Sequence, residues 1–401
     1  MNEPSELTPD RVSPLKIPLL LFFRGVAFLA VMVGVTLSLH WYIGLRLFDD
    51  AGLQRPWSTI GWVWLFAMYG SIFVGFIGGR LFPRRLARLS QWVGFVWMGA
   101  FGLLVAGFAL SDLALALASL VTPTAGWRGA REAIVLSVVG PALVWGFIVA
   151  RAPRLKQVSI SIAGLHPDLD GFRLVQLSDV HLGETLDRRF ARRLVKQVNA
   201  LDADAVVITG DLVDGSVARL KDEVLPMGEL QSRHGTFFVT GNHEYYSGAS
   251  SWMAECARLG MTVLHNTHRV LMRGEGQLVL AGVPDVEGAR FAESHRPDVT
   301  AAFSGAPPGA PRVLLSHQPR FAKAAASANV ALMLSGHTHG GQMFPFMAFV
   351  RLQQPVVGGL HEIAGVLTYT SVGTGYWGPP FRVGTWGEVT LVTLRAQPTR
   401  A

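Results

Sequence analysis

The segment VALMLSGHTHGGQ (Val330–Gln342) joins a short apolar run to two histidines and two glycines. A short apolar run of this kind is consistent with a buried strand. His337 and His339 follow it, and residues two apart in an extended segment point to the same side. Polar side chains beside a core are costly to bury without partners. The segment therefore predicts a buried strand that ends in a pair of ligating histidines.

Four other apolar runs in the second half of the chain end in a similar way. Each stops at residue types that commonly ligate metals: Asp179 and His181 after FRLVQLS, Asp211 and Asp214 after AVVITG, Asn242, His243 and Glu244 after TFFVTG, and His317 after RVLLS. Helical stretches separate these runs, and strands that alternate with helices predict an α/β domain. Because ligands bind at the carboxyl ends of strands in open α/β sheets, we expect these side chains to converge.

The pooled side chains favour a metal centre with two ions. The set comprises two carboxylates, one amide oxygen and four imidazoles, from Asp179, Asp211, Asn242, His181, His317, His337 and His339. This mixture of oxygen and nitrogen donors suits Mn, Fe or Zn better than Ca²⁺. Seven ligands exceed the needs of one tetrahedral ion, so we predict two divalent ions that share a bridging carboxylate.

The order of these motifs resembles that of the calcineurin-like metallophosphoesterases. The motifs are D-x-H at Asp179, G-D-x-x-D at Gly210, G-N-H-E at Gly241, a lone histidine at His317 and G-H-T-H at Gly336. The resemblance covers about residues 170–395, and GHTHGGQ with the later TSVGTGYWGPPFRVG is similar to the YkuE-type branch. It implies a four-layer α/β/β/α sandwich with the metals at its strand ends.

The resemblance also assigns a role to each ligand. One metal would be held by Asp179, His181 and His339, the other by Asn242, His317 and His337, with Asp211 as the bridge. In such sites the two ions clamp a phosphate and activate a shared water for attack on phosphorus.

Four further residues have expected roles outside the ligand set. The resemblance implies that His243, oriented by Asp214, is a proton donor to the leaving oxygen. We expect Glu244 to be structural. Arg382, in the glycine-rich loop after Trp377, is a candidate to bind a substrate phosphate.

The first 152 residues predict a four-helix transmembrane region, with the lipid bilayer as a partner. The chain is 50% hydrophobic and only 16% charged, too apolar for an ordinary soluble enzyme of 401 residues. Four runs are long enough to cross a bilayer: residues 25–45, 57–79, 92–110 and 133–150. A soluble bundle would need polar faces that these runs lack, and a cleaved signal peptide does not fit four successive spans.

The basic residues beside the spans predict the orientation. Nine Lys and Arg flank the side shared by the amino terminus, the loop at 80–91 and the carboxyl part, whereas four flank the other side. This bias places the catalytic part in the cytoplasm of an integral, inner-membrane protein. The division expected is a cytoplasmic segment at 1–24, the transmembrane region at 25–152 and the metallophosphoesterase domain at 153–396. No nucleic-acid motif accompanies the net charge of +7, so we expect no nucleic-acid partner.

The sequence leaves three hypotheses about function open. The first is a membrane-tethered hydrolase of a lipid-linked phosphate or pyrophosphate, of the UDP-diacylglucosamine type that related branches cleave. The second is the same chemistry on a soluble nucleotide or phosphoprotein. The third is a non-enzymatic membrane scaffold, which would be expected to have lost ligands, and none is lost here. Substrate specificity resides in loops that one sequence does not decode.

Overall fold

The computed structural model describes residues 19–122 and 130–397. The chain separates into two compact units, residues 1–69 and 70–401, and each is described by itself. The first holds α1 (Leu19–Gly44), a π-helical turn (Leu45–Asp49) and the start of α2 (Trp57–Leu81). The second holds the rest of α2, α3 (Arg84–Ala118), α5 (Arg131–Ala150) and two β-sheets. The domain boundaries expected at 24/25 and 152/153 stay predictions.

Within residues 19–122 and 130–397, four helices are long and apolar enough to cross a membrane, which confirms the predicted number of candidate spans. They are Phe23–Asp49, Trp57–Leu81, Arg84–Ala118 and Arg131–Ala150. One detail differs from expectation, because only residues 82–83 separate α2 from α3. Arg84, Arg85 and Arg88 therefore lie in the first turns of α3 and not in a loop at 80–91. Pro83 has no backbone N–H with which to continue α2 and is the N-cap of α3, so it sets the break. Most of the expected cytoplasmic segment, and Arg128, lie outside the described residues.

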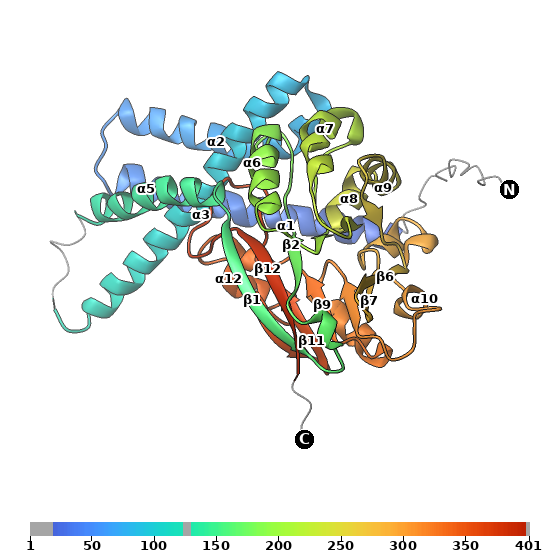
Figure 1. The fold of residues 1–401 in the computed structure, drawn as a ribbon. Helices are drawn as coiled ribbons and strands as arrows, with labels where there is room; N and C mark the ends of the chain where they lie inside the picture. Colours follow the sequence, from blue (N-terminus) through green and yellow to red (C-terminus); the bar gives the residue numbers. More distant parts are fainter. Residues whose placement is uncertain (1–18, 123–129, 398–401) are drawn as a thin grey trace. The chain divides into compact units, whose positions relative to one another are not determined.

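Two six-stranded sheets form the centre of the second unit (Figure 1). The first has the order β1 (Arg154–Ile162), β12 (Glu388–Ala396), β2 (Phe172–Leu177), β3 (Ala205–Thr209), β4 (Thr236–Val239) and β5 (Thr262–Val263). The second has the order β10 (Gly359–Ile363), β11 (Val366–Thr370), β9 (Leu332–Ser335), β8 (Arg312–Leu315), β7 (Gly276–Gly282) and β6 (Thr267–Arg273). In both sheets the central strands run parallel.

The period-two alternation of side chains gives each sheet two apolar faces and so builds four layers. Leu174 and Val207 of the first sheet meet Leu280 and Leu334 of the second in one buried core. The outer face of the first sheet packs against α6 (Arg188–Asn199), α7 (Val217–Val224) and α9 (Ala249–Arg258). The outer face of the second packs against α10 (Val299–Ala302) and α11 (Ala322–Ala325). This arrangement confirms the predicted α/β/β/α sandwich.

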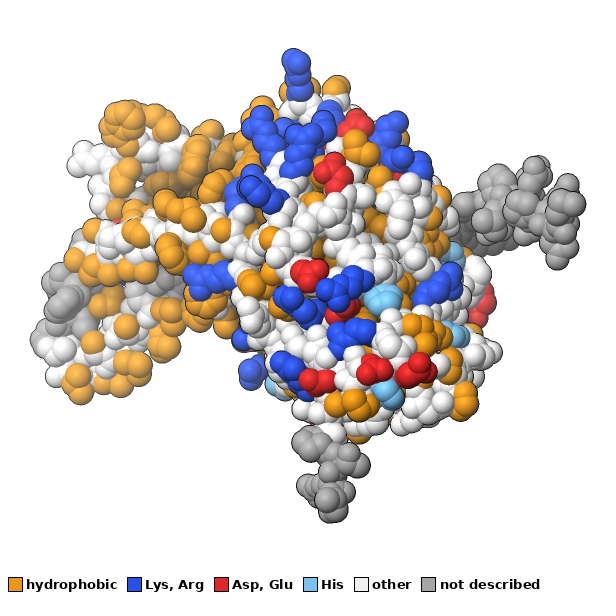
Figure 2. All heavy atoms as spheres, in the orientation of Figure 1, with side chains coloured by type: hydrophobic (Ala, Val, Ile, Leu, Met, Phe, Trp, Pro, Cys, Tyr) orange, Lys and Arg blue, Asp and Glu red, His pale blue; other side chains and the backbone are white. Residues whose placement is uncertain are grey.

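Within the second unit, charged groups of the apolar helices form some of the contacts with the sandwich. Arg84 of α3 pairs with Glu223, and Arg88 lies 3.2 Å from Asp187. The outer side of α6 is basic, and Figure 2 shows Lys and Arg side chains gathered over this part of the molecule. The exposed basic residues of α6 are Arg189, Arg192, Arg193 and Lys196.

Candidate metal centre

The parallel strands place all the predicted ligands at one edge of the sandwich. Each ligand follows β2, β3, β4, β8 or β9 directly in the chain. Three groups of side chains have ligand atoms within 4.8 Å of one another: Asp179, His181 and His339; Asp211, His317 and His337; and His181, Asp211 and His243. The first two groups coincide with the two metal positions expected from the sequence, apart from Asn242 and the bridge.

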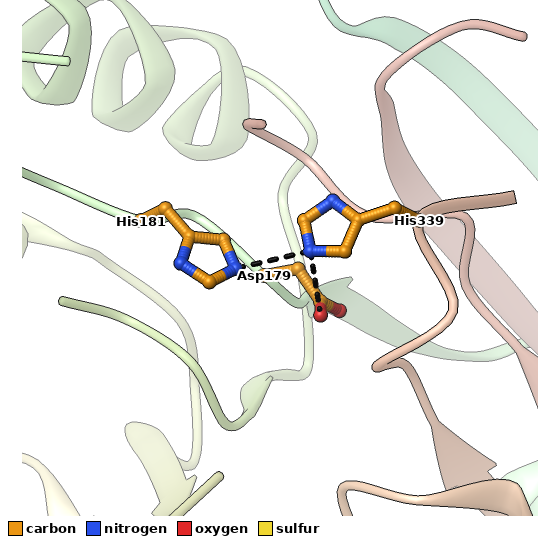
Figure 3. Close-up of side chains that lie close together, drawn as sticks. All are labelled: Asp179, His181 and His339. Atoms are coloured by element: carbon orange, nitrogen blue, oxygen red, sulfur yellow. Dashed lines mark hydrogen bonds and ion pairs between the residues drawn. The ribbon is translucent and has the colours of Figure 1, made fainter. Parts of the chain in front are cut away.

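The first group consists of buried or nearly buried side chains that face one another (Figure 3). His339 Nε2 lies 3.3 Å from Asp179 Oδ1 and 3.0 Å from His181 Nε2. Two lone pairs at this separation would repel, so the two nitrogens share either a proton or a cation. A divalent ion fits this donor set.

The second group has the same character and includes an amide without a partner. His317 Nε2 lies 3.1 Å from Asp211 Oδ2 and 3.1 Å from His337 Nδ1. The Oδ1 atom of Asn242 is buried and has no hydrogen-bond partner among the residues that the structure describes. An orphaned buried acceptor is costly, so this oxygen fits the role of a metal ligand.

Asp211 lies between the two groups, as a bridging carboxylate must. Its Oδ2 atom is 3.1 Å from His317 Nε2 and 3.8 Å from His181 Nε2, which belong to different groups. Its other oxygen, Oδ1, accepts a 2.8 Å hydrogen bond from the backbone N–H of His243. Burial alone would raise the pKa of Asp211, but the surrounding histidines outweigh it and hold the pKa well below its usual range. The carboxylate is therefore ionised.

Neighbouring groups fix the orientation of the imidazoles. His317 Nδ1 lies 2.8 Å from the carbonyl of Thr209, and His181 Nδ1 lies 2.8 Å from Asp214 Oδ1. Both contacts require a proton on Nδ1, which directs the Nε2 lone pair toward the centre. Burial lowers the pKa of His337 to about 3, so its ring is neutral, as a metal ligand must be.

The backbone at the centre is strained. Asp179, His181, Asp211, His337 and His339 all have φ between 51° and 72°. Residues other than glycine rarely adopt this left-handed conformation, and each instance costs about 1–3 kcal/mol. Five such residues in one site hold the ligating atoms together at the expense of local stability, as is typical of functional sites.

His243 occupies the position expected of a proton donor. Its Nδ1 atom lies 2.7 Å from Asp214 Oδ1, so Asp214 contacts both His181 and His243. Burial alone would lower the pKa of His243, but Asp211 and Asp214 outweigh it and raise the pKa to about 9. The ring therefore carries a proton at neutral pH. His243 also belongs to the third group of possible ligands, which leaves its role as a donor a prediction.

Glu244 holds the loop that carries Asp211, a role that the sequence did not specify. Its Oε2 atom accepts hydrogen bonds from the N–H groups of Gly241 (2.6 Å) and Asp211 (2.9 Å). Its Oε1 atom accepts from Leu212 (2.8 Å) and Val213 (3.3 Å). The side chain is fully buried at the start of α8 (Asn242–Ser247). It thus ties the end of β3 to the end of β4.

Arg382 does not occupy the place expected of a phosphate ligand. The side chain is 0% exposed, and its guanidinium donates to backbone carbonyls, among them those of Gly375, Val372 and His339. No exposed N–H remains for a substrate, so the expectation of substrate binding is wrong. The residue instead fastens the loop that follows β11 to the backbone of His339, a predicted metal ligand.

The fold and the site define a metallophosphoesterase domain preceded by candidate membrane spans. The calcineurin-like phosphoesterase family matches residues 172–341. A Danio rerio protein named transmembrane protein with metallophosphoesterase domain is 34% identical over 361 residues, which are 85% of this chain and 81% of the relative. The Bos taurus protein of that name is 39% identical over 67% of this chain, which spans 63% of that relative. The uncharacterized metallophosphoesterase YkuE of Bacillus subtilis is 28% identical over 57% of this chain and 80% of its own length. The chain belongs to the calcineurin-like phosphoesterase family.

Proposed function

We propose that this chain is a membrane-anchored phosphoesterase that hydrolyses a phosphoester or pyrophosphate bond with two divalent metals. The observation that supports this most is the position of Asp211 between two groups of buried ligands. The donor set favours Mn, Fe or Zn, and two such ions would supply Lewis acidity and an activated water when bound.

The side chains of the site divide the remaining work among them. Asp179, His181 and His339 would hold one ion, and Asn242, His317 and His337 the other. Asp214 positions His243 through Nδ1, which leaves the Nε2–H of the ring to donate to a leaving oxygen. Arg219, also near this site, is paired with Glu184 at 3.2 Å. His243 is thus the donor that this arrangement offers.

The substrate that we propose is lipid-linked, of the UDP-diacylglucosamine type. Only residues 151–153 separate α5 from β1, so the sandwich cannot move far from the bilayer. The exposed basic side of α6 would favour an anionic membrane surface. We further propose an inner-membrane location with the sandwich in the cytoplasm, as the basic residues that flank the spans predict.

Replacing Asp211 by Asn tests the proposed chemistry. The bridge needs a full carboxylate to hold two cations, so Asp211→Asn should abolish Mn²⁺-dependent hydrolysis of 4-nitrophenyl phosphate and lower the metal content. Asp222→Asn, an exposed position on α7, is the matched control and should change neither. A folded Asp211→Asn protein with unchanged turnover and two bound metals would contradict the proposal.

A further inference from the structure

A cavity of about 490 Å³ leads from the proposed proton donor to the ends of two apolar helices. His243 and Asp214 line it at the metal centre. Its opposite wall comes from the end of α2 and the beginning of α3: Phe76, Gly79, Arg80, Gln91 and Phe95. All these residues belong to the second compact unit. The candidate membrane spans therefore contribute directly to the space beside the reacting centre.

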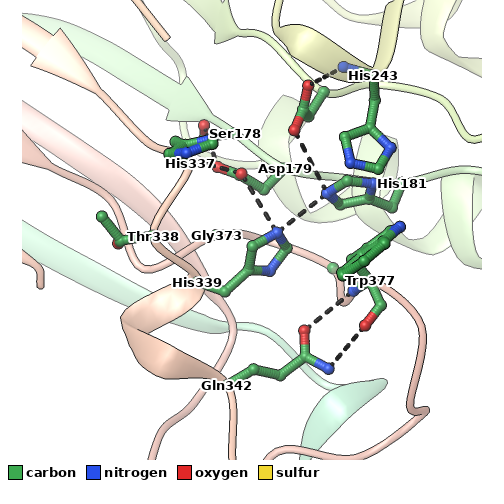
Figure 4. Close-up of polar contacts among 12 residues, drawn as sticks. Ser178, Asp179, His181, His243, His337, Thr338, His339, Gln342, Gly373 and Trp377 are labelled. Carbon is green, nitrogen blue, oxygen red and sulfur yellow. Dashed lines mark hydrogen bonds and ion pairs between the residues drawn. The ribbon is translucent and has the colours of Figure 1, made fainter. Parts of the chain in front are cut away.

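Aromatic rings line a continuous route through this cavity. The ring of Trp377 lies 5.5 Å from that of His243 and 6.0 Å from that of Phe76. Phe95 follows at 5.1 Å from Phe76. Gln342, which comes just after the metal ligand His339, fixes the backbone of Trp377 through hydrogen bonds of 3.0 and 2.9 Å (Figure 4). This apolar surface is thus held in place beside the metal centre.

Two of these rings, those of Phe76 and Trp377, are only partly covered by protein. Phe76 is 44% exposed and Trp377 43% exposed, although both face a cavity lined by polar side chains. Removing such rings from water stabilises a complex in proportion to the apolar area that becomes buried. An apolar group of a ligand would gain this energy, whereas a purely polar ligand would not.

Among the charged side chains that line the cavity, Arg80 is available to pair with an anionic ligand. Arg219 is paired with Glu184, and Asp214 is held by two histidines. Arg80, at the end of α2, is exposed and forms no ion pair with any part of the chain that the structure describes. Arg80 therefore offers the lining cation whose charge is not already balanced.

We propose that this cavity is the substrate site for an anionic phospholipid-like phosphoester, and that α2 determines specificity. The reacting phosphoryl group would lie at the metals, a second anionic group at Arg80, and the apolar chain along Trp377, Phe76 and Phe95 toward the bilayer. This inference rests on the proposed function and deepens it. The spans are thus part of the recognition site, in addition to their role as an anchor.

The apolar part of the site can be tested with alkyl phosphonates, which carry the headgroup chemistry but resist hydrolysis. We would measure the Kd of methyl and dodecyl phosphonate by titration calorimetry, with the full chain in nanodiscs containing Mn²⁺ and empty nanodiscs as a blank. Phe76→Ser should reduce the preference for the dodecyl compound about tenfold. Ile77→Ser is the matched control, because Ile77 is an exposed neighbour on α2 that does not line the cavity. Ile77→Ser should keep the wild-type preference for dodecyl over methyl phosphonate. Partition of the dodecyl compound into the nanodisc lipid is the same for both variants, so it does not account for a difference between them.

The charged part of the site can be tested with small anions that resist hydrolysis. Arg80→Gln should weaken the binding of methylenediphosphonate, a stable analogue of pyrophosphate, about tenfold while the Kd of phosphate changes less than twofold, because only the diphosphonate reaches beyond the metals. Arg85→Gln, an exposed arginine on α3 outside the cavity, is the control. An unchanged dodecyl preference in Phe76→Ser, or an unchanged ratio of the methylenediphosphonate Kd to the phosphate Kd in Arg80→Gln, would overturn the proposal.

Two further outcomes distinguish a lipid ligand from a soluble nucleotide, and the binding site from the proposed activity. Binding of ADP as tight as that of dodecyl phosphonate, with the same response to Arg80→Gln, would assign the cavity to soluble nucleotides and overturn the lipid site. If the wild-type chain shows the predicted pattern of Kd values but hydrolyses no phosphoester, the site stands and the proposed function fails.

Discussion

Asp214→Asn and His243→Ala should have different effects, because one carboxylate oxygen serves two histidines. Asp214 Oδ1 lies 2.8 Å from Nδ1 of His181, a predicted ligand, and 2.7 Å from Nδ1 of His243, a predicted donor. Loss of a carboxylate behind a ligating histidine typically weakens metal binding by about 10–100-fold. We therefore expect Asp214→Asn to need more Mn²⁺ for half-maximal activity by about that factor. His243→Ala removes no predicted ligand, so its metal content should stay at two.

Turnover is the second measurement that tests the roles of Asp214 and His243. Loss of a positioned proton donor costs about 10²–10⁴-fold, or about 2.7–5.5 kcal/mol at the transition state. The pKa of His243 is raised to about 9 by Asp211 and Asp214 against the effect of burial. A donor works in its protonated form, so wild-type turnover should fall as the pH rises through that pKa. Bound cations oppose the proton, which places this decline at or below about pH 9. His243→Ala should lack the decline.

Elemental analysis and Mn²⁺ titration of 4-nitrophenyl phosphate hydrolysis provide the assay, with Asp222→Asn as the control. If His243→Ala binds only one metal, His243 is a ligand. Its place in the group with His181 and Asp211 would then be a ligating one. That result would refute the division of roles. An Asp214→Asn protein with unaltered metal dependence would refute the link through His181.

Two other substitutions test the scaffold and the topology. Glu244→Gln should lower the free energy of unfolding by about 2–5 kcal/mol, because either orientation of the amide turns its NH₂ toward two backbone N–H donors. The midpoint of thermal unfolding measures this, and exposed Glu229→Gln should leave it unchanged. Ser304→Cys, in an exposed loop, should react with a membrane-impermeant maleimide only after spheroplasts are permeabilised. Cys256 needs no replacement, because it is fully buried and burial raises the pKa of its thiol. Labelling of Ser304→Cys without permeabilisation would contradict a cytoplasmic sandwich.

Local sequence was sufficient to predict which side chains meet at the ends of the strands. The carboxyl ends of parallel strands share an edge, so a list of polar residues after apolar runs already predicts which side chains meet. Asp179, His181, His317 and His339 illustrate this, since each comes within two to four residues of a strand end. The four spans were equally predictable, because their apolar runs are long and free of charge.

Features that depend on contacts between distant segments were not predictable in this way. Arg382 looked like a phosphate ligand because it follows aromatic residues in a glycine-rich loop, but the fold surrounds its guanidinium with carbonyls from several segments. Phe76 looked like an ordinary residue of a membrane span, although it lies beside Trp377, about 300 positions later. A single sequence has no signal for either contact. The structure was needed to place Glu244 for the same reason, since its four donors come from two loops.

The docking of the sandwich on its helices affects how this molecule can be divided. The backbone N–H of Arg382 donates to the carbonyl of Gly146 in α5 at 3.0 Å, while its side chain donates to the carbonyl of His339. Phe381 lies so close to Gly99 of α3 that a Cβ there would come within 2.5 Å of the ring. A shortened, water-soluble chain that begins at residue 153 would uncover this ring and leave the Arg382 N–H without its acceptor. Activity lost in such a fragment would therefore reflect a loosened metal ligand as well as a missing membrane, and screens for substrates belong on the intact chain.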